Sequence, residues 1–355
     1  MTIVPPTTPP SQFPMAMMVL VASVLAWFSP AAIAATETAT PAVAAAAAAA
    51  DPDAERLFKS IVKISVRAIP DARSNASLGA QREGTGIVIG DNALILTIGY
   101  LIVEADEVTI VDRRGRALPA QVVGYDHGTG FGLVRSVVPI DATPVTLGDP
   151  SKLAAGESVL IVNHDGPDDV TLARVASRRL FTGNWEYLVE HAIFTSPPAL
   201  NWSGAALVDK DLKLLGIGSL IVRIATDEGE RAPGNMFVPI DALKPILADL
   251  VSGGRRAGPA RPWLGVAADE VQGRLVVARV STDGPADSAG VEVGDIILAV
   301  GSEPVRTQAE FYRKVWSRGA AGADIPLRVL QGVEVKEIKV PSIDRVDYFR
   351  PRTMH

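Results

Sequence analysis

Short hydrophobic runs, separated by turn residues, fill most of the chain. Residues 61–67 alternate apolar and polar positions, as a strand with one buried face does. Similar runs recur after it, with Gly, Asp, Asn and Pro between them, and no regular alternation of strands with helices accompanies them. The pattern therefore predicts a mostly β protein built of antiparallel barrels. The expected strands are 86–89, 94–97, 107–111, 120–125, 132–138, 158–162, 172–177, 191–195, 206–208 and 214–221.

A helix is predicted over residues 238–251, with Asp241 near its start and two glycines beyond its end. The stretch 252–262 is rich in Gly, Arg and Pro and is typical of a linker between domains. After it comes a unit of small-domain size, with a predicted helix over 307–317 and a strand over 325–330. The predicted organisation is an N-terminal segment 1–34, an Ala-rich linker 35–53, a large domain 54–251, a linker 252–262, a small domain 263–345 and a tail 346–355.

The N-terminal segment has the character of an export signal. Residues 15–28 are apolar and uncharged, and Ala32-Ile33-Ala34 follows them as a cleavage pattern. Residues 1–14 depart from that pattern because they contain no Lys or Arg. An uncleaved membrane anchor is the alternative, since the apolar run approaches the ~20 residues that span a bilayer. Either interpretation predicts that the rest of the chain is periplasmic or otherwise extracytoplasmic.

Composition narrows the function further. The 355 residues contain 34 Lys and Arg against 40 Asp and Glu, a net charge of -6, with no basic block. Nucleic acid is therefore not expected as a partner, because phosphate binding needs a concentrated positive face. The absence of cysteine excludes disulfides and thiolate metal sites. No metal cluster or phosphate-binding loop is visible in the sequence, so no metal and no cofactor are expected.

Several ordered pieces of the large domain point to a family. They are Gly84-Thr85-Gly86 at the start of a strand, 94–97, 120–126, the segment 198–208 around Ser203, Gly216-Ile217-Gly218 and 237–241. Their order resembles the HtrA/DegP group over residues 54–345. That resemblance implies a trypsin-like double β-barrel followed by a small α+β PDZ domain, generally exported in bacteria and commonly trimeric.

The resemblance also assigns the catalytic positions one by one. Ser203 stands at the nucleophile position, but Tyr100 stands at the place of the histidine and Gly130 at the place of the aspartate. A phenol ordinarily titrates near pH ~10 and is a poor base at neutral pH. Losing the base of a serine triad lowers kcat by roughly a million-fold, about 8 kcal/mol of transition-state stabilisation. The catalytic triad is therefore predicted to be degenerate.

The loop around Ser203 is altered as well. The resemblance implies an oxyanion hole formed by the backbone N–H groups of Asn201 and Ser203, and Asn201 can adopt the positive φ expected there. Trp202 is expected either to fill the former substrate cleft or to pack in the core. His127 is the one histidine expected to be able to replace the base, because it lies three residues before Gly130. His164 and His191 look like residues at strand ends.

The PDZ-like unit is better preserved than the triad. In that family a peptide adds as an edge strand beside a helix, and its terminal carboxylate lies on backbone N–H groups of a short loop. We expect hydrophobic C-termini as ligands, with a docked structural spacer as the alternative. The expected peptide-binding residues are Trp263, Leu264, Gly265 and Val266 in the loop and strand, and Phe311, Val315 and Trp316 on the helix.

These features lead to one main hypothesis and two rivals. The main one is an exported HtrA-like pseudoprotease that binds peptides or misfolded envelope proteins, or that regulates an active HtrA relative by mixed assembly, as a homo-oligomer. The first rival is an active serine endopeptidase in which Ser203 uses a non-standard base. The second is a purely structural envelope protein.

Overall fold

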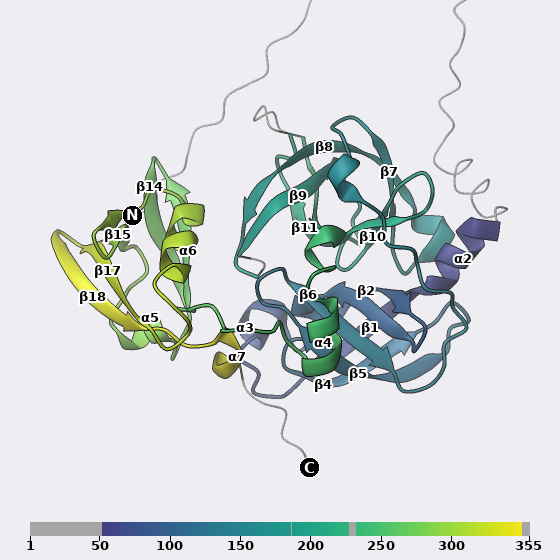
Figure 1. Cartoon of the computed structure of the whole chain (residues 1–355), viewed down its shortest axis with the longest axis horizontal. Helices are drawn as coiled ribbons and strands as arrows, with labels where there is room; N and C mark the ends of the chain where they lie inside the picture. Colours follow the sequence, from purple (N-terminus) through teal and green to yellow (C-terminus); the bar gives the residue numbers. More distant parts are fainter. Residues whose placement is uncertain (1–51, 186, 227–231, 350–355) are drawn as a thin grey trace, which may run out of the picture. The chain divides into compact units, whose positions relative to one another are not determined.

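The computed structural model describes residues 52–185, 187–226 and 232–349, and most of its helices and strands are labelled in Figure 1. Six antiparallel strands close into one barrel and the next six into a second, which confirms the predicted fold class. The first barrel has the order β1-β2-β3-β6-β5-β4 and the second β10-β11-β12-β9-β8-β7. The strands are β1 (Ile61–Ala68), β2 (Gln81–Gly90), β3 (Leu94–Ile98), β4 (Ala105–Val111), β5 (Ala117–Tyr125), β6 (Phe131–Ser136), β7 (Ser158–Val162), β8 (Thr171–Thr182), β9 (Leu188–Ser196), β10 (Ala206–Val208), β11 (Leu214–Val222) and β12 (Gly234–Pro239).

The third sheet belongs to the predicted PDZ domain. Its order is β13-β14-β15-β17-β18, with β16 paired to β15, and the helix α6 packs along β13 and β15. Seventeen fully or nearly fully buried apolar residues make a core of its own for this domain. The elements are β13 (Val266–Val271), β14 (Arg274–Val280), α5 (Pro285–Ser288), β15 (Ile296–Val300), β16 (Glu303–Pro304), α6 (Gln308–Trp316), β17 (Asp324–Gln331) and β18 (Glu334–Pro341).

Close strand packing positions the first barrel against the Ser203 loop. Every residue of β3 is buried, and the strand lies beside β2. A Cβ at Gly86 would lie 2.6 Å from side-chain atoms of both Ile64 and Ile95, so only glycine fits there. The same strand carries Gly84, whose missing Cβ would lie 2.7 Å from the Ser203 carbonyl oxygen. The glycines of β2 therefore let this strand lie directly against the loop that carries Ser203.

The helix predicted over 238–251 is wrong in part. β12 continues to Pro239, a 3-10 turn η4 covers Ile240–Ala242, and the α-helix α4 begins only at Leu247 and ends at Gly253. Pro245 lacks a backbone N–H and disfavours helical geometry at the residue before it, so a continuous helix cannot form. The other short helices are α2 (Pro52–Ser60), α3 (Asn75–Leu78), η1 (Gly99–Leu101), η2 (Pro150–Lys152), η3 (Gly166–Asp169) and α7 (Arg345–Tyr348).

The predictions for the two ends of the chain have different outcomes. The signal or anchor segment 1–34 and nearly all of the Ala-rich linker lie outside the described residues. At the other end, α7 extends into the segment predicted to be a tail, and Tyr348 lies with its ring centroid 4.6 Å from that of Trp263. Among the residues that the structure describes, no helix is both long enough and apolar enough to cross a membrane. All described residues fall in one unit of the chain, which starts at Ala39.

Candidate active site and peptide groove

Ser203 lies in the turn between β9 and β10, and its backbone is fixed from two sides. Its carbonyl accepts a hydrogen bond from the Thr85 N–H at 2.8 Å, and the N–H of Gly204 donates to the Gly218 carbonyl at 2.9 Å. Gly204 has φ 74°, and a Cβ there would lie 2.1 Å from the Thr85 carbonyl oxygen. The turn is therefore held between strands of both barrels, in a shape that requires glycine after the serine.

Tyr100 is the side chain that meets the Ser203 hydroxyl. It lies in η1, directly after β3, and its Oη is 2.9 Å from Ser203 Oγ and 2.8 Å from the Ser219 carbonyl oxygen. A carbonyl oxygen can only accept a hydrogen bond, so the phenol of Tyr100 donates its single O–H to the Ser219 carbonyl. The Ser203 hydroxyl is then the donor toward Tyr100 Oη. The acceptor of the serine proton is thus the oxygen of a protonated phenol, a far weaker base than an imidazole.

Trp202 shares the carbonyl that Tyr100 uses. Its indole Nε1 donates to the Ser219 oxygen at 3.1 Å, and its side chain is half-buried and does not belong to the core. Ser219 lies at a register shift between β11 and β12, so its carbonyl stands outside the regular ladder. Two aromatic donors therefore converge on one strand carbonyl beside the Ser203 hydroxyl.

Gly130 offers no carboxylate near Tyr100. It has φ 82°, its N–H donates to the Asp126 carbonyl and its own carbonyl accepts from Gly99 N–H at 2.6 Å. The neighbouring Asp126 is 5% exposed, and its carboxylate accepts from the Thr129 N–H at 2.8 Å and from Arg256 at 3.1 Å. The nearest acid in this loop is therefore engaged with the linker arginine and its own turn.

Asn201 does not take up the conformation expected of it. Among the described non-glycine residues with positive φ, Asn201 is absent. Its side-chain amide donates to Asp165 at 2.7 Å and to Asp169 at 3.0 Å. Two carboxylates thus lie beside the loop in which an oxyanion would have to be stabilised, and negative charge there opposes a developing negative charge.

The histidines lie differently from the sequence-based expectation. The ring of His127 packs edge-on against Tyr125, with centroids 4.2 Å apart, and stacks on Phe349 at 5.6 Å. Burial, followed by the charge of Arg345, holds the pKa of His127 well below its usual 6.5. In the described part of the chain, neither His127 nor any other histidine is hydrogen-bonded to Ser203 Oγ.

His164 is linked to Ser203 through hydrogen bonds to a shared neighbour, whereas His127, among the described residues, is not. Its Nδ1 lies 3.0 Å from the hydroxyl of Thr85, the residue whose N–H holds the Ser203 carbonyl. Burial lowers the pKa of His164, with Asp165 as the largest opposing influence. His191 is exposed on β9. The sequence analysis ranked His127 first, because the approach of His164 to this region depends on the pairing of the two barrels and is not visible in the sequence.

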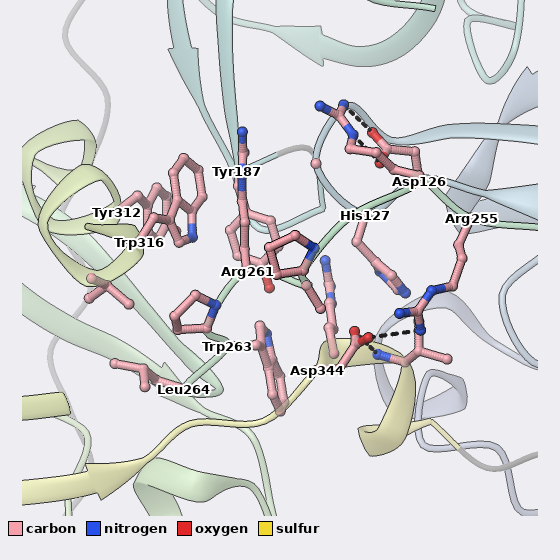
Figure 2. Close-up of a pocket in the computed structure, with 18 of the residues that line it drawn as sticks. Asp126, His127, Tyr187, Arg255, Arg261, Trp263, Leu264, Tyr312, Trp316 and Asp344 are labelled. Carbon is pink, nitrogen blue, oxygen red and sulfur yellow. Dashed lines mark hydrogen bonds and ion pairs between the residues drawn. The ribbon is translucent and has the colours of Figure 1, made fainter. Parts of the chain in front are cut away.

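The expected peptide-binding residues come together in one pocket of about 150 Å³ between the start of β13 and α6 (Figure 2). Gly265 has φ 79°, which turns the chain sharply just before β13. The Leu264 and Gly265 carbonyls accept from Ala286 and Ser281, yet neither N–H of these two residues has an acceptor among the described residues. The residues brought together are Trp263, Leu264, Gly265, Val266, Phe311, Val315 and Trp316.

Four arginines also line this pocket, and the sequence analysis did not single out any of them. Arg255 is paired with Asp344 and Arg256 with Asp126, each at 3.1 Å. Arg261 instead lies over the ring of Trp316, 4.2 Å from its centroid, and within the described residues it has no carboxylate partner. Burial, followed by the charge of Arg256, lowers the pKa of Arg261. The clustered arginines of 255–261 were visible in the sequence, but only as linker composition.

Tyr187, Tyr312, Arg345 and His127 also line the pocket. Tyr312 lies one residue after the predicted Phe311 and faces the same groove, and Arg345 begins α7. Tyr187 comes from the large domain, at the tip of the hairpin formed by β8 and β9 (Figure 2). In the sequence, Trp185 beside the Gly183-Asn184 turn is the feature that could have drawn attention to Tyr187. It does not show which part of the molecule this hairpin contacts. No group of residues suited to hold a metal ion is present in the described part of the chain.

Comparisons with known proteins agree with these two domains. Residues 84–217 match the trypsin-like peptidase domain model and residues 262–341 match the PDZ domain model. The chain is 27% identical over 308 residues to a probable periplasmic serine endoprotease DegP-like of Pseudomonas fluorescens, covering 81% of this chain and 62% of that protein. It is 28% identical over 293 residues to the serine protease PepD of Mycobacterium tuberculosis, covering 76% of this chain and 62% of that protein.

Solved structures show the same fold. An alanine variant of the HtrA-type protease AlgW, with a tripeptide, matches with a TM-score of 0.52 at 21% identity, covering 84% of this chain and 96% of that one. AlgW with a decapeptide matches with a TM-score of 0.50 at 20% identity. The resemblance to HtrA/DegP-type proteins with a PDZ domain is thereby confirmed. The chain spans about 62% of the length of the curated relatives named above.

Proposed function

We propose that this chain, with its trypsin-like and PDZ domains of the HtrA/DegP kind, is an exported pseudoprotease that binds peptides or misfolded envelope proteins without cleaving them. The observation that carries the proposal is the partner of Ser203 Oγ. It is the phenol of Tyr100, 2.9 Å away, whose own proton is committed to the Ser219 carbonyl. A serine hydroxyl in that arrangement has no group that can take up its proton.

The surroundings of the serine support the loss of proteolysis. Gly130 supplies no carboxylate to orient a base at this site, and Asp126 is paired with Arg256. Asn201 lacks the positive φ expected of the oxyanion loop and holds two carboxylates beside it. Each of the three groups that acyl transfer needs, a base, its orienting partner and an oxyanion site, is therefore altered.

The binding function is supported by the groove beside α6. Its apolar residues are those expected from the sequence, and the Leu264 and Gly265 N–H groups remain without acceptors in the described chain. A terminal carboxylate would satisfy such N–H groups, as in other peptide-binding domains of this type. Arg261 adds a cation that forms no salt bridge with the described residues. We therefore assign hydrophobic C-terminal peptides as the ligand class, in the periplasm that the names of the DegP-like relatives indicate.

An active serine endopeptidase is the second candidate. The retained Ser203 and the contact of His164 with Thr85 favour it, because a rearrangement of that region could bring an imidazole to the hydroxyl. Family resemblance also suggests a homo-oligomer or mixed assembly with an active relative. Cross-linking and mass measurement of the purified chain, alone and with such a relative, address the assembly.

Digestion of unfolded casein separates the two candidates. We expect fluorescein-labelled casein to stay intact with the wild-type chain, at the rate seen with Ser203→Ala. Cleavage by the wild type that disappears in Ser203→Ala would refute the pseudoprotease. If it also disappears in His164→Ala but not in His191→Ala, His164 is the base of the second candidate.

A further inference from the structure

Two buried nitrogen atoms of residues that line the groove pocket have no hydrogen-bond partner within the described chain. They are Nε of Arg345, at the start of α7, and Nδ1 of His127, in the loop after β5. Both side chains lie against Phe349: the imidazole stacks on its ring, and the guanidinium carbon is 5.6 Å from its centroid. In Figure 2, His127 lies on the side of the pocket opposite Tyr312 and Trp316. Buried polar atoms are nearly always hydrogen-bonded, so two in one place require a partner from outside the chain.

Arg345 carries a buried charge without a counter-charge. Its side chain is 7% exposed, and its two terminal nitrogens donate to the backbone carbonyls of Trp185 and Asn184, each at 3.2 Å. The ring of Trp185 lies 4.9 Å from the guanidinium carbon and stabilises the charge through a cation–π contact. These contacts use the terminal nitrogens and the face of the guanidinium, and they leave the Nε–H donor unused.

The pocket as a whole has more positive than negative groups. Four arginines and two aspartates line it, and each aspartate pairs at 3.1 Å with one arginine of the linker. The other two arginines, Arg261 and Arg345, form no salt bridge with any residue that the structure describes. A buried cation without a counter-charge is costly, so this lining favours an anionic ligand over a neutral one.

His127 can donate a hydrogen bond to such an anion. Burial, and then the charge of Arg345, hold the pKa of His127 well below its usual 6.5, so its imidazole is neutral at neutral pH. A neutral imidazole carries its proton on one of its two nitrogens, and the tautomer protonated at Nδ1 places a second donor near Nε–H of Arg345. One charged and one neutral donor together fit the oxygens of a carboxylate or a phosphate group.

We propose that Arg345 and His127 form an anion-binding site that takes a carboxylate or phosphate group. The site lies beside the loop in which we expect the peptide terminus. There the backbone of Trp263 pairs with that of Ile343, two residues before Arg345, through hydrogen bonds of 2.9 and 3.1 Å. The site is nevertheless built from other groups than the N–H donors of that loop, and it is separate from Ser203.

Two sources would supply an anionic group here. One is an acidic side chain of the bound peptide. Successive side chains of an extended peptide point to opposite sides, so when the last one enters the apolar wall the penultimate one points away from it. A peptide with glutamate at its penultimate position therefore represents this source, which, unlike the site itself, rests on the proposed peptide-binding function. The other source is a free small anion.

Inorganic phosphate tests the site without a peptide. The imidazole NMR signals of the purified chain are followed during a phosphate titration at constant ionic strength, and those of His127 are identified by their loss in His127→Phe. We expect them to shift with saturation and a Kd on the order of 1 mM, the affinity of about two charge-assisted hydrogen bonds. Arg345→Lys keeps the charge but removes Nε–H and should weaken binding about tenfold. Arg274→Gln, at an exposed position of β14, removes a charge outside the pocket and should change nothing.

Two fluorescein-labelled decapeptides that end in Ala-Glu-Phe and Ala-Gln-Phe, both with a free carboxylate, test the peptide source by fluorescence anisotropy. We expect the Glu peptide to bind about tenfold more tightly than the Gln peptide. Arg345→Lys and His127→Phe should both lose this preference, and Arg274→Gln should keep it.

The two experiments together separate the possible outcomes. A saturable phosphate shift with equal binding of the two peptides assigns the site to a free anion. A saturable shift without binding of either peptide supports the anion site and refutes the proposed peptide function. The absence of both the saturable shift and the preference for the Glu peptide overturns the anion site.

Discussion

The Ser203 site and the PDZ groove each contain an aromatic side chain where a ligand would bind, but the two side chains come from different places. At Ser203 the turn, its glycine and the strand contacts are in place, and the substituted side chain, Tyr100, belongs to the rigid turn after β3. In the groove the wall residues are in place, and the filling side chain, Tyr187, comes from a hairpin tip of another domain.

The two sites differ in the origin of the aromatic side chain that occupies them. Tyr100 Oη lies within hydrogen-bonding distance of two groups of the second barrel, 2.9 Å from Ser203 Oγ and 2.8 Å from the Ser219 carbonyl oxygen. Tyr187 instead packs on side chains of the groove, and its ring centroid lies 5.2 Å from that of Tyr312. The proposed loss of catalysis therefore depends on residues of the barrels alone, whereas access to the groove depends on a contact between two domains.

Restoring the triad is the change with the largest expected effect. Tyr100→His combined with Gly130→Asp supplies a base and its orienting carboxylate, which together account for up to ~10⁶ in kcat in a serine protease. An activated p-nitrophenyl ester releases p-nitrophenolate in a burst when the serine is acylated. Because the oxyanion loop is altered too, we expect the rate of this burst to rise by about 10²-fold or more. Ser203→Ala in the same background is the control.

Gly130 has φ 82°, so aspartate there is strained by roughly 1–3 kcal/mol. Tyr100→His alone avoids that strain and should still give a smaller burst. If neither variant gains a Ser203-dependent burst, the altered oxyanion loop, and not the missing base, prevents catalysis.

The rigidity of the Ser203 turn can be measured through Gly204. Its replacement by alanine brings a Cβ to 2.1 Å from the Thr85 carbonyl at a positive φ, so we expect a loss of about 3 kcal/mol or more in the free energy of unfolding. Gly156→Ala is matched to it, because Gly156 also has positive φ but no atom within 4 Å of its missing Cβ. That variant should lose about 1 kcal/mol in denaturant titration. Equal losses would show that the turn is not held by its neighbours.

In the groove, Arg261 should contribute a moderate part of peptide affinity. Its guanidinium lies over Trp316 with no carboxylate partner among the described residues, so we expect Arg261→Ala to weaken binding of the free-carboxylate peptide about five- to tenfold. The same peptide with a C-terminal amide should lose less. Arg255→Ala is the control, because Arg255 is already paired with Asp344. An equal loss for both peptides would mean that Arg261 does not contact the carboxylate.

The smallest expected effect concerns pH. The pKa of His127 in the folded chain is well below 6.5, because of burial and then of Arg345, so the unfolded state binds its proton first as pH falls. This residue therefore stabilises the fold fully above about pH 6.5 and progressively less below it, by at most ~1.4 kcal/mol per pH unit. His127→Phe keeps a ring between Tyr125 and Phe349. It should lose less Tm than the wild type between pH 7.5 and 5.5, and an equal loss would contradict this origin.

Much of the fold could be predicted from residues alone. Strands such as 94–97 and 206–208 follow from their apolar runs. The resemblance to HtrA/DegP proteins, and not the local pattern, placed Tyr100 and Ser203 in one site. Local pattern was sufficient there because each strand buries its own side chains. The helix predicted over 238–251 was wrong in part, because the prediction followed the apolar periodicity and gave too little weight to Pro245. Proline lacks a backbone N–H and interrupts a helix at its own position.

What the sequence could not show depends on contacts between distant segments. His164 reaches Thr85 across 79 positions, and Tyr187 reaches Tyr312 across the boundary between domains. Neither residue has a local pattern that distinguishes it from an ordinary strand or turn residue. The partners of a side chain become visible only when the barrels and the third sheet are assembled.

The most direct test of the account is whether the wild-type Ser203 hydroxyl can be made to react. The purified chain is incubated with a fluorophosphonate at neutral pH, and its mass and peptides are then measured. The account predicts no adduct on Ser203 beyond that of a chain unfolded in denaturant. A stoichiometric adduct on Ser203 in the folded wild type would contradict it.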